Sequence, residues 1–264
     1  MTKIALAEVR PRRRSPLENL RALEGVLDRV PAAEIAVFPE LYLSGYMIGD
    51  AFHRLALSRA GKELKLLSEI AERKQKWVLV GAPMENPERK GEVINAAVLI
   101  GPKGDLHVTG KRYLPTFGPF EEGLQFSPGG DRSVAETPFG RIGVLICYEV
   151  FFPEITRALA LSGADLFLVI SASPVTSRSL FAKLLPARAI ENATPLAYVN
   201  RVGVEDSIVF AGGSGFYDPR GEVLEPERLD LGEGQQVLTY DVPLEDYAKY
   251  RPSRPVLRDA SVLS

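Results

Sequence analysis

Apolar and polar positions along the chain follow two patterns that alternate through its first two-thirds. Short runs rich in Val, Ile and Leu, such as residues 141–146, are typical of buried strands. Stretches with an apolar residue every three or four positions are typical of helices that cover a sheet. The first such stretch begins at Ser15-Pro16-Leu17-Glu18, which has the sequence of a capping box with proline at the first helical position.

The two patterns predict strands that alternate with helices and are interrupted by hairpins. Strands are expected over residues 3–8, 34–38, 77–83, 92–100, 106–110, 133–137, 141–146, 166–171, 196–201 and 236–241, with a late hairpin over 213–217 and 222–224. Helices are expected over residues 16–30, over 52–74 with a break near Gly61, and over 153–162, 180–192 and 244–249. This mixture indicates a layered α/β fold with mixed sheets. Nothing marks a linker or a repeat, so residues 1–264 are expected to form a single domain.

The composition excludes several classes of protein. A formal net charge of −2 gives no electrostatic reason to expect nucleic acid or a membrane surface as a partner, and the basic run at residues 10–14 is short enough for a solvated loop. No apolar stretch approaches the ~20 residues of a membrane span, and residues 1–8 do not resemble a signal peptide, so a cytoplasmic protein is expected. The single cysteine excludes an internal disulfide framework. Scarce asparagine beside plentiful proline and arginine is typical of proteins from hot environments.

That cysteine, Cys147, stands where a strand ends and a helix is about to begin, because Pro153 suits a first helical turn. Backbone N–H groups at such a corner are not used by a sheet and can stabilise negative charge. A lone cysteine in an apolar context is usually only a small buried hydrophobe, so a reactive Cys147 needs a base. Neither His53 nor His107 has an acid placed to orient it, and another group must take that role.

Two loops offer charged partners. Glu40 follows a buried strand in Phe38-Pro39-Glu40, where poor solvation makes a carboxylate a better base than at the surface. Lys111 begins a loop rich in aromatic residues and proline, where it could stabilise an oxyanion. Either residue alone is more often a solvated charge.

Taken together, the three sites resemble the nitrilase, or carbon–nitrogen hydrolase, superfamily. Its pattern has a glutamate in Phe-Pro-Glu, a lysine opening a Gly-Lys-x-x-Leu-Pro loop and a cysteine in an Ile-Cys-Tyr-[Asp/Glu] setting, and Glu40, Lys111 and Cys147 match it in order, context and spacing. The resemblance spans almost the whole chain and includes residues 170–174, 187–192, 200–203 and 212–214.

The resemblance implies an αββα sandwich of two mixed sheets flanked by helices, paired with a second subunit in a homodimer or a higher homo-oligomer. It also implies that Glu40 transfers protons, that Cys147 forms a thioester with an amide substrate, and that Lys111 and the backbone N–H of Tyr148 hold the oxyanion. A second glutamate is expected at Glu122, with Glu121 as the fallback. No cofactor and no metal are implied, and no cluster of residues with metal-ligand spacing is evident in the sequence.

The substrate is less determined than the chemistry. An aromatic and mostly uncharged set of residues is expected to bind it and fits a small linear carboxamide; the set is Tyr46, Tyr113, Phe117, Tyr148, Phe151, Ser171 and Ser173. Residues 111–117, 171–174 and 203–214 also resemble the glutaminase part of glutamine-dependent NAD synthetases, but those usually have an acid directly after the cysteine. In that case ammonia would pass to a separate synthetase.

Four other possibilities have less support. N-carbamoyl hydrolases usually place a basic residue soon after the cysteine, and nitrilases proper a tryptophan beside it; neither stands there in this chain. The apolipoprotein N-acyltransferases, which share Ile-Cys-Tyr-Glu, are excluded because no membrane span is evident. A binding protein that keeps the triad as a relic is disfavoured because all three residues are present in matching contexts.

Overall fold

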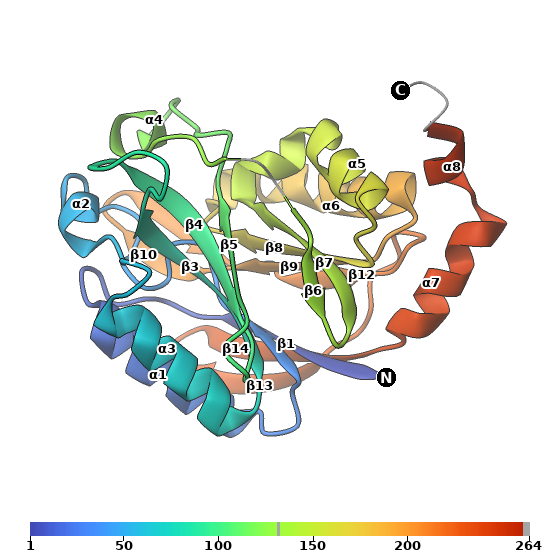
Figure 1. Ribbon diagram of the computed structural model, residues 1–264, viewed down its shortest axis with the longest axis horizontal. Coiled ribbons are helices and arrows are strands. Elements are labelled where there is room, and N and C mark those ends of the chain that lie inside the picture. The colour runs from blue at the N-terminus through green and yellow to red at the C-terminus, as the bar shows by residue number, and fades with distance from the viewer. Residues whose placement is uncertain (131–132, 261–264) are drawn as a thin grey trace.

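The computed structural model describes residues 1–130 and 133–260 and contains two large mixed sheets (Figure 1). The first has seven strands in the order β13-β14-β1-β2-β3-β4-β5, of which β1, β2 and β3 are parallel. Its strands are β1 (Thr2–Glu8), β2 (Ile35–Val37), β3 (Trp77–Glu85), β4 (Val93–Ile100), β5 (Leu106–Gly110), β13 (Glu227–Gly232) and β14 (Gln235–Val242).

The second sheet has five strands in the order β12-β9-β8-β7-β6, and β7, β8 and β9 are parallel. Its strands are β6 (Ala135–Thr137), β7 (Gly140–Ile146), β8 (Leu166–Ser171), β9 (Leu196–Asn200) and β12 (Gly215–Tyr217). A separate hairpin consists of β10 (Val202–Glu205) and β11 (Ile208–Ala211).

Side chains alternate between the faces of each strand, and this alternation builds the layers. Ile4 and Leu6 of β1 belong to a core shared with the second sheet, whereas Ala7 on the opposite face packs in the core beneath the helices α1 (Pro16–Arg29) and α3 (Lys62–Lys74). The helices α5 (Pro153–Leu161) and α6 (Arg178–Asn192) cover the outer face of the second sheet. The order of layers is therefore helix, sheet, sheet, helix, as expected.

Shorter helices lie at the edges of this sandwich. They are α2 (Ala51–Leu55), α4 (Glu122–Gln125), α7 (Leu244–Ser253) and α8 (Val256–Ala260). In the described part of the chain, no helix combines the length and the hydropathy that crossing a membrane requires.

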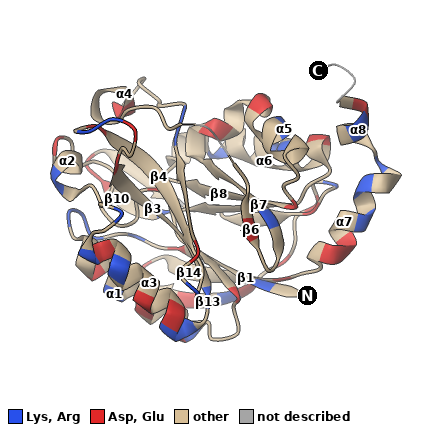
Figure 2. Cartoon of the chain, viewed as in Figure 1, with Lys and Arg blue, Asp and Glu red and all other residues tan. Residues whose placement is uncertain are grey.

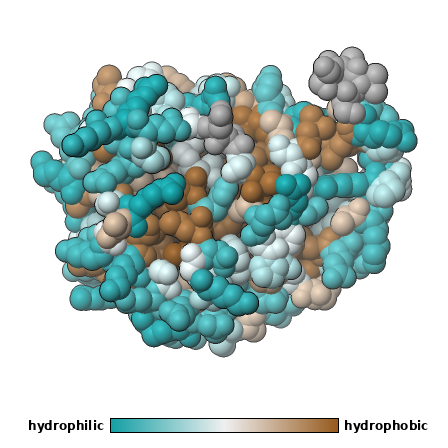
Figure 3. All heavy atoms as spheres, in the orientation of Figure 1, coloured by the Kyte–Doolittle hydropathy of each residue, from teal (hydrophilic) through white to brown (hydrophobic). Residues whose placement is uncertain are grey.

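The surface reflects the same layering. Charged residues of both signs line the outward faces of α1 and α3 (Figure 2), while apolar side chains gather toward the middle of the face shown in Figure 3. Amphipathic helices with this distribution pack their apolar inner faces against the sheet.

Most of the expected strands and helices are present, but two local interpretations are wrong. The Ser15 side chain makes no capping hydrogen bond to α1 and instead bonds the carbonyl of Arg13, so the capping box does not form. The late hairpin is reduced to a single bridge between Tyr217 and Val223, because β12 pairs with β9. The β10–β11 hairpin and β13 were not expected from the sequence.

Gly81 in β3 fixes the position of the loop that follows β2. Its backbone N–H donates to the carbonyl of Pro39, and its carbonyl accepts from the N–H of Leu43. A Cβ at position 81 would lie 2.5 Å from the Cα of Glu40 and closer still to the nitrogen of Leu41. Only glycine lets the two backbones approach this closely.

The variant Gly81→Ala is therefore expected to be destabilised by about 1–3 kcal/mol, because the added methyl group overpacks against backbone. Gly25→Ala in α1 is the control: nothing lies within 4 Å of its Cβ position, and alanine favours a helix by up to ~1 kcal/mol. Urea unfolding of both variants measures the difference. Equal stability of Gly81→Ala and the wild type would show that the close approach does not constrain the loop.

Candidate active site

Glu40 lies just beyond β2, on a loop held against β3, and is completely buried. One carboxylate oxygen, Oε1, accepts hydrogen bonds from Lys111 Nζ at 2.7 Å and from Asn95 Nδ2 at 2.8 Å. The other, Oε2, accepts the backbone N–H of Ala172 at 2.8 Å. A buried carboxylate with this many donors has its oxygens hydrogen-bonded and is held in one orientation.

Lys111 follows β5, and its backbone N–H donates to the carbonyl of Asn95 in β4. Its ammonium group is completely buried and lies 2.7 Å from Glu40 Oε1 and 2.6 Å from Glu122 Oε1. Glu122, the first residue of α4, also accepts a hydrogen bond from the Tyr46 hydroxyl. Glu121 is exposed, whereas Glu122 is buried and accepts a hydrogen bond from Lys111, so the second glutamate at the site is Glu122.

Cys147 directly follows β7 and begins a 3-10 turn over Cys147–Phe151 that precedes α5. Its φ of 50° is unusual for a residue other than glycine, and such backbone conformations need surrounding structure to hold them. Glu149 does so, because one of its carboxylate oxygens accepts the N–H of Ile146 at 2.9 Å and the other accepts the N–H of Arg112 at 2.7 Å. This buried side chain thereby joins the turn at Cys147 to the loop that follows Lys111.

The charges at the site act on one another. Burial raises the pKa of the Cys147 thiol to about 12; the negative charge of Glu40 contributes to the rise, while the Lys111 ammonium and the Ser171 hydroxyl oppose it. Burial lowers the pKa of Lys111, but Glu122 and Glu40 raise it more, so the pKa lies above its usual range and the amine stays charged. Burial also raises the pKa of Glu122. The charges of Glu40, Lys111 and Glu122 are therefore close enough to the sulfur to change the pKa of Cys147.

The aromatic residues expected at the substrate site form a cluster beside this group. The ring of Tyr148 lies 5.3 Å from that of Phe117 and 5.4 Å from that of Phe151, measured between centroids. Tyr113 stacks on Phe152 at 3.9 Å. The cluster thus surrounds Tyr148, the residue directly after Cys147, whose backbone N–H is the one expected to hold the oxyanion.

The remaining residues expected to bind the substrate are Ser171, Ser173 and Tyr46. Ser171 ends β8 and is buried, and Ser173 lies two residues further along. Tyr46 is bound at both ends, since its hydroxyl donates to Glu122 and its backbone N–H donates to Glu205 Oε2 at 2.9 Å. Tyr46 therefore belongs to the charge network of Glu40, Lys111 and Glu122, and its role in substrate binding stays a prediction.

Sequence patterns missed three residues of this network. Asn95 holds Glu40, Glu149 holds the turn at Cys147, and Glu205 holds the loop at Tyr46 and Met47 while pairing with the buried Arg201 at 2.5 Å. Signals existed for two of them, since Asn95 is the one polar residue of the strand VINAAVLI and Glu149 is the acidic position of the Ile-Cys-Tyr-[Asp/Glu] pattern. Glu205 carried none, because the hairpin that presents it was not expected.

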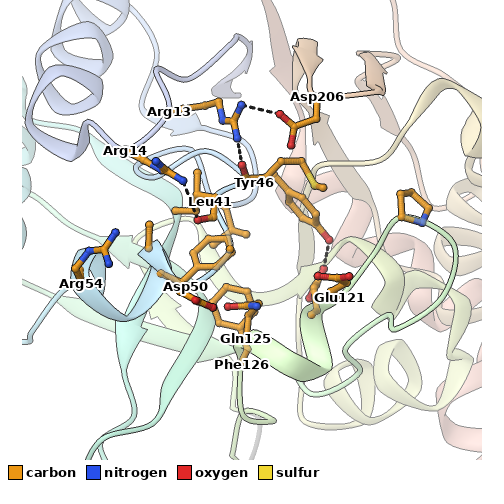
Figure 4. A pocket seen from close by; sticks show the side chains of 17 residues that line it. Arg13, Arg14, Leu41, Tyr46, Asp50, Arg54, Glu121, Gln125, Phe126 and Asp206 are labelled. Carbon is orange, nitrogen blue, oxygen red and sulfur yellow. Dashed lines mark hydrogen bonds and ion pairs between the residues drawn. The ribbon is translucent and has the colours of Figure 1, made fainter.

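A cavity of about 640 Å³ lies beside Tyr46 and Glu121 (Figure 4). Tyr46 and Glu122 are among its lining residues, whereas Cys147, Glu40 and Lys111 are not. At its rim Arg13 forms an ion pair with Asp206 at 2.8 Å. The cavity is therefore in contact with Tyr46 and Glu122 but not with the sulfur of Cys147.

Across residues 1–130 and 133–260, no group of three or more His, Cys, Asp or Glu side chains is arranged to hold a metal ion. The ammonium of Lys111 is the cation that faces both carboxylates. Together with the buried thiol, these groups can transfer a proton, provide a nucleophile and stabilise an oxyanion.

Comparison with known proteins identifies the family. A family model described as carbon-nitrogen hydrolase matches residues 3–252. The chain is 33% identical over 264 residues to an (R)-stereoselective amidase of a Pseudomonas species, covering 99% of this chain and 92% of that protein. It is 32% identical to a glutamine-dependent NAD(+) synthetase of Thermotoga maritima, covering 87% of this chain but only 39% of the synthetase.

A solved structure adds chemical detail. A variant of the amidase from Nesterenkonia sp. AN1, which carries the acetamide moiety of fluoroacetamide on its active-site cysteine, has a TM-score of 0.78 and 30% identity to this chain, covering 98% of this chain and 96% of that one. The chain therefore belongs to the carbon–nitrogen hydrolase family.

The pKa of Cys147 gives a direct test of the site. A free cysteine has a pKa of about 8.5, so most of it is ionised at pH 10. With the pKa of Cys147 raised to about 12, its thiol is expected to stay protonated at that pH and to ionise only above it. The difference in absorbance at 240 nm between the wild type and Cys147→Ala, titrated with pH, measures the thiolate alone. A midpoint near pH 8.5 would contradict the buried environment described.

Proposed function

We propose that the protein hydrolyses the C–N bond of small linear carboxamides through a cysteinyl thioester, with Glu40, Lys111 and Cys147 as its catalytic residues. The observation that carries this proposal is the hydrogen bond of 2.7 Å between Lys111 Nζ and Glu40 Oε1, fully buried and within the electrostatic environment of the Cys147 sulfur. A carboxylate and a cation beside a nucleophile serve acyl transfer. Burying the two charges carries a desolvation cost, and that cost favours a functional reason for their position.

The first half-reaction begins with a neutral thiol, because the pKa of Cys147 lies far above neutral pH. Glu40 takes the thiol proton as the sulfur attacks the amide carbon, so a free thiolate need not accumulate. Lys111 and the backbone N–H of Tyr148 hold the oxygen of the tetrahedral intermediate. When the intermediate collapses, the C–N bond breaks and Glu40 gives its proton to the departing ammonia.

The second half-reaction releases the acyl group. Glu40, again a carboxylate, takes a proton from water, and the resulting hydroxide attacks the thioester carbon. Collapse breaks the C–S bond, the proton returns to the sulfur, and the carboxylic acid leaves. Glu122 and Asn95 act in both halves as positioning residues, because they hold Lys111 and Glu40 in fixed orientations.

The substrate class rests on the environment of the sulfur. Tyr148, Phe117 and Phe151 present aromatic surface beside Cys147, which suits a short apolar acyl chain. The (R)-stereoselective amidase and the Nesterenkonia amidase, to which the chain is similar, carry names that agree with an amide substrate. Assembly into a homodimer or larger oligomer remains a prediction.

Glutamine hydrolysis is the second candidate, favoured by the similarity to the Thermotoga maritima synthetase. In this role the protein would supply ammonia to a separate synthetase. The residue directly after Cys147 is Tyr148, which provides no negative charge to meet the ammonium group of glutamine. We therefore rank glutamine below simple amides.

Ammonia release from propionamide, butanamide and L-glutamine tests the proposal. The wild type is expected to hydrolyse the simple amides, and Cys147→Ala to lose roughly a thousandfold or more of the rate, as removal of a nucleophile does elsewhere. Glu40→Gln is expected to lose roughly a hundredfold or more of the rate, because the carboxylate that it removes is the base in both half-reactions.

Glu34→Gln is the matched control for Glu40→Gln, since Glu34 immediately precedes β2 whereas Glu40 lies just beyond it. The control is expected to hydrolyse amides at the wild-type rate. The proposal fails if the wild type releases no ammonia from any amide, or if Cys147→Ala is as active as the wild type. A rate confined to glutamine would establish the second candidate instead.

A further inference from the structure

Among the described residues, Arg201 has the largest side chain that is completely buried, and it directly follows β9. Its Nη1 lies 2.5 Å from Oε1 of Glu205, which is itself buried at the end of β10. Apart from this ion pair, no nitrogen of the guanidinium has a hydrogen-bond partner in the described part of the chain. Most of its N–H donors are therefore unused, which is costly for a buried cation.

Stability alone does not explain this buried pair. Two charges lose their hydration on burial, and their attraction offsets that loss only where hydrogen bonds satisfy the remaining groups. Arg201 has instead the ring of Phe210, whose centroid lies 4.3 Å from its Cζ. Burial accordingly lowers the pKa of Arg201, although the negative charges of Glu205 and Glu40 oppose the change. The position of the pair is better explained by what Glu205 holds.

The other carboxylate oxygen of Glu205 holds the loop that follows β2. Oε2 accepts the backbone N–H of Tyr46 at 2.9 Å and that of Met47 at 2.7 Å. Gly45 leaves room for this approach, because its φ is 82° and an added Cβ would lie 3.2 Å from Glu205 Oε1. Glu205 thus joins the hairpin beyond the second sheet to a loop of the first sheet.

Tyr46 extends this connection to the charge network. Its ring centroid lies 6.1 Å from that of Phe210, the ring that the Arg201 guanidinium covers. Its hydroxyl donates to Glu122 Oε1, and the same oxygen accepts the ammonium of Lys111 at 2.6 Å. The orientation of Glu122 therefore depends on where the loop places Tyr46.

We propose that Arg201 is a positioning residue of the active site and acts through Glu205 and Tyr46. The ion pair fixes the carboxylate of Glu205, and that carboxylate fixes the backbone at Tyr46. The hydroxyl of Tyr46 then keeps Glu122 in the orientation in which it accepts the hydrogen bond from Lys111. This inference rests on the proposed amide hydrolysis and adds to it a residue that does not touch the reacting atoms.

The test measures kcat and KM for butanamide. Arg201→Met removes the cation, so that Glu205 loses its partner, and kcat is expected to fall roughly ten- to hundredfold, as small misplacements of catalytic groups do elsewhere. KM is expected to change by less than about threefold, because the lost interaction serves the transition state. Arg201→Lys keeps a cation and is expected to retain more of kcat. Glu205→Gln breaks the pair from its other side and is expected to lower kcat likewise, which provides the test if Arg201→Met does not fold.

Tyr46→Phe tests the route of the effect. By itself it removes the hydroxyl that holds Glu122, and it is expected to lower kcat. Adding Arg201→Met to Tyr46→Phe is then expected to lower kcat little further, because the contact through which Arg201 acts is already absent. Effects of the two substitutions that multiply would overturn the inference, since Arg201 would then act by another route.

Arg251→Met is the matched control. Arg251 is a partly buried cation that pairs with Asp165 at 3.3 Å, beside the amino end of β8. Because β7 and β8 are parallel, that end of the sheet is opposite to the one that carries Cys147. The control also loses a cation and its hydrogen bonds, yet it is expected to keep the wild-type kcat. Circular dichroism and thermal unfolding establish that each variant is folded.

Alkylation of Cys147 by iodoacetamide gives a second measurement that does not require amide turnover. The sulfur forms a bond to the methylene carbon as iodide leaves, and Glu40 takes the thiol proton. Arg201→Met is expected to slow this reaction, measured by intact-protein mass spectrometry, whereas Arg251→Met is expected to leave it unchanged.

The outcomes distinguish this inference from the proposed function. If the wild type hydrolyses no amide, the proposed function fails and the alkylation rates decide the inference. If amides are hydrolysed and Arg201→Met keeps the wild-type kcat, or if Arg201→Met and Arg251→Met lower kcat alike, the inference fails and the proposed function stands. Equal alkylation rates of the wild type and Arg201→Met would overturn the inference in either case.

Discussion

The site depends on a single buried ammonium group, that of Lys111, placed between two buried carboxylates. Glu40 and Glu122 would repel each other in a medium of low polarity if the cation were absent. Burying three charges is costly, and it is tolerated only where hydrogen bonds satisfy the remaining lone pairs. Asn95, the N–H of Ala172 and the Tyr46 hydroxyl provide those bonds. The charge cluster consequently determines where several distant segments of the chain must lie.

Those segments come from both sheets. Glu40 and Lys111 follow strands of the first sheet, Cys147 follows a strand of the second, and the N–H of Ala172, just beyond β8, donates to Glu40 across the gap. Glu149 makes a second connection, from the turn at Cys147 to the loop after Lys111. The two sheets could not shift relative to each other without breaking these bonds. The sandwich therefore acts as a rigid support for the proposed chemistry, as precise sites require.

The sequence predicted the parts of this arrangement that depend on local pattern. The strands before Glu40 and Cys147 are short and apolar, the strand before Lys111 closes a hairpin, and each lies where it was expected. Residues whose roles depend on long-range packing were harder to find: Glu205 acts on Tyr46 across 159 positions, and no local pattern announces such a contact. The capping box at Ser15 failed for a related reason, because its hydroxyl found another partner in Arg13. The intrinsic propensity of a segment allows several local structures, and tertiary contacts determine which of them forms.

The most direct test of the account is the free energy of unfolding of Lys111→Met, Glu122→Gln and the double variant, measured in urea at neutral pH. If the ammonium holds the two carboxylates together, Lys111→Met leaves Glu40 and Glu122 buried without a cation and is strongly destabilised, by about 3–5 kcal/mol. Adding Glu122→Gln to the Lys111→Met variant should then stabilise the protein, although the same substitution costs stability in the wild type. Equal effects of Glu122→Gln in both backgrounds, within about 0.5 kcal/mol, would contradict the account.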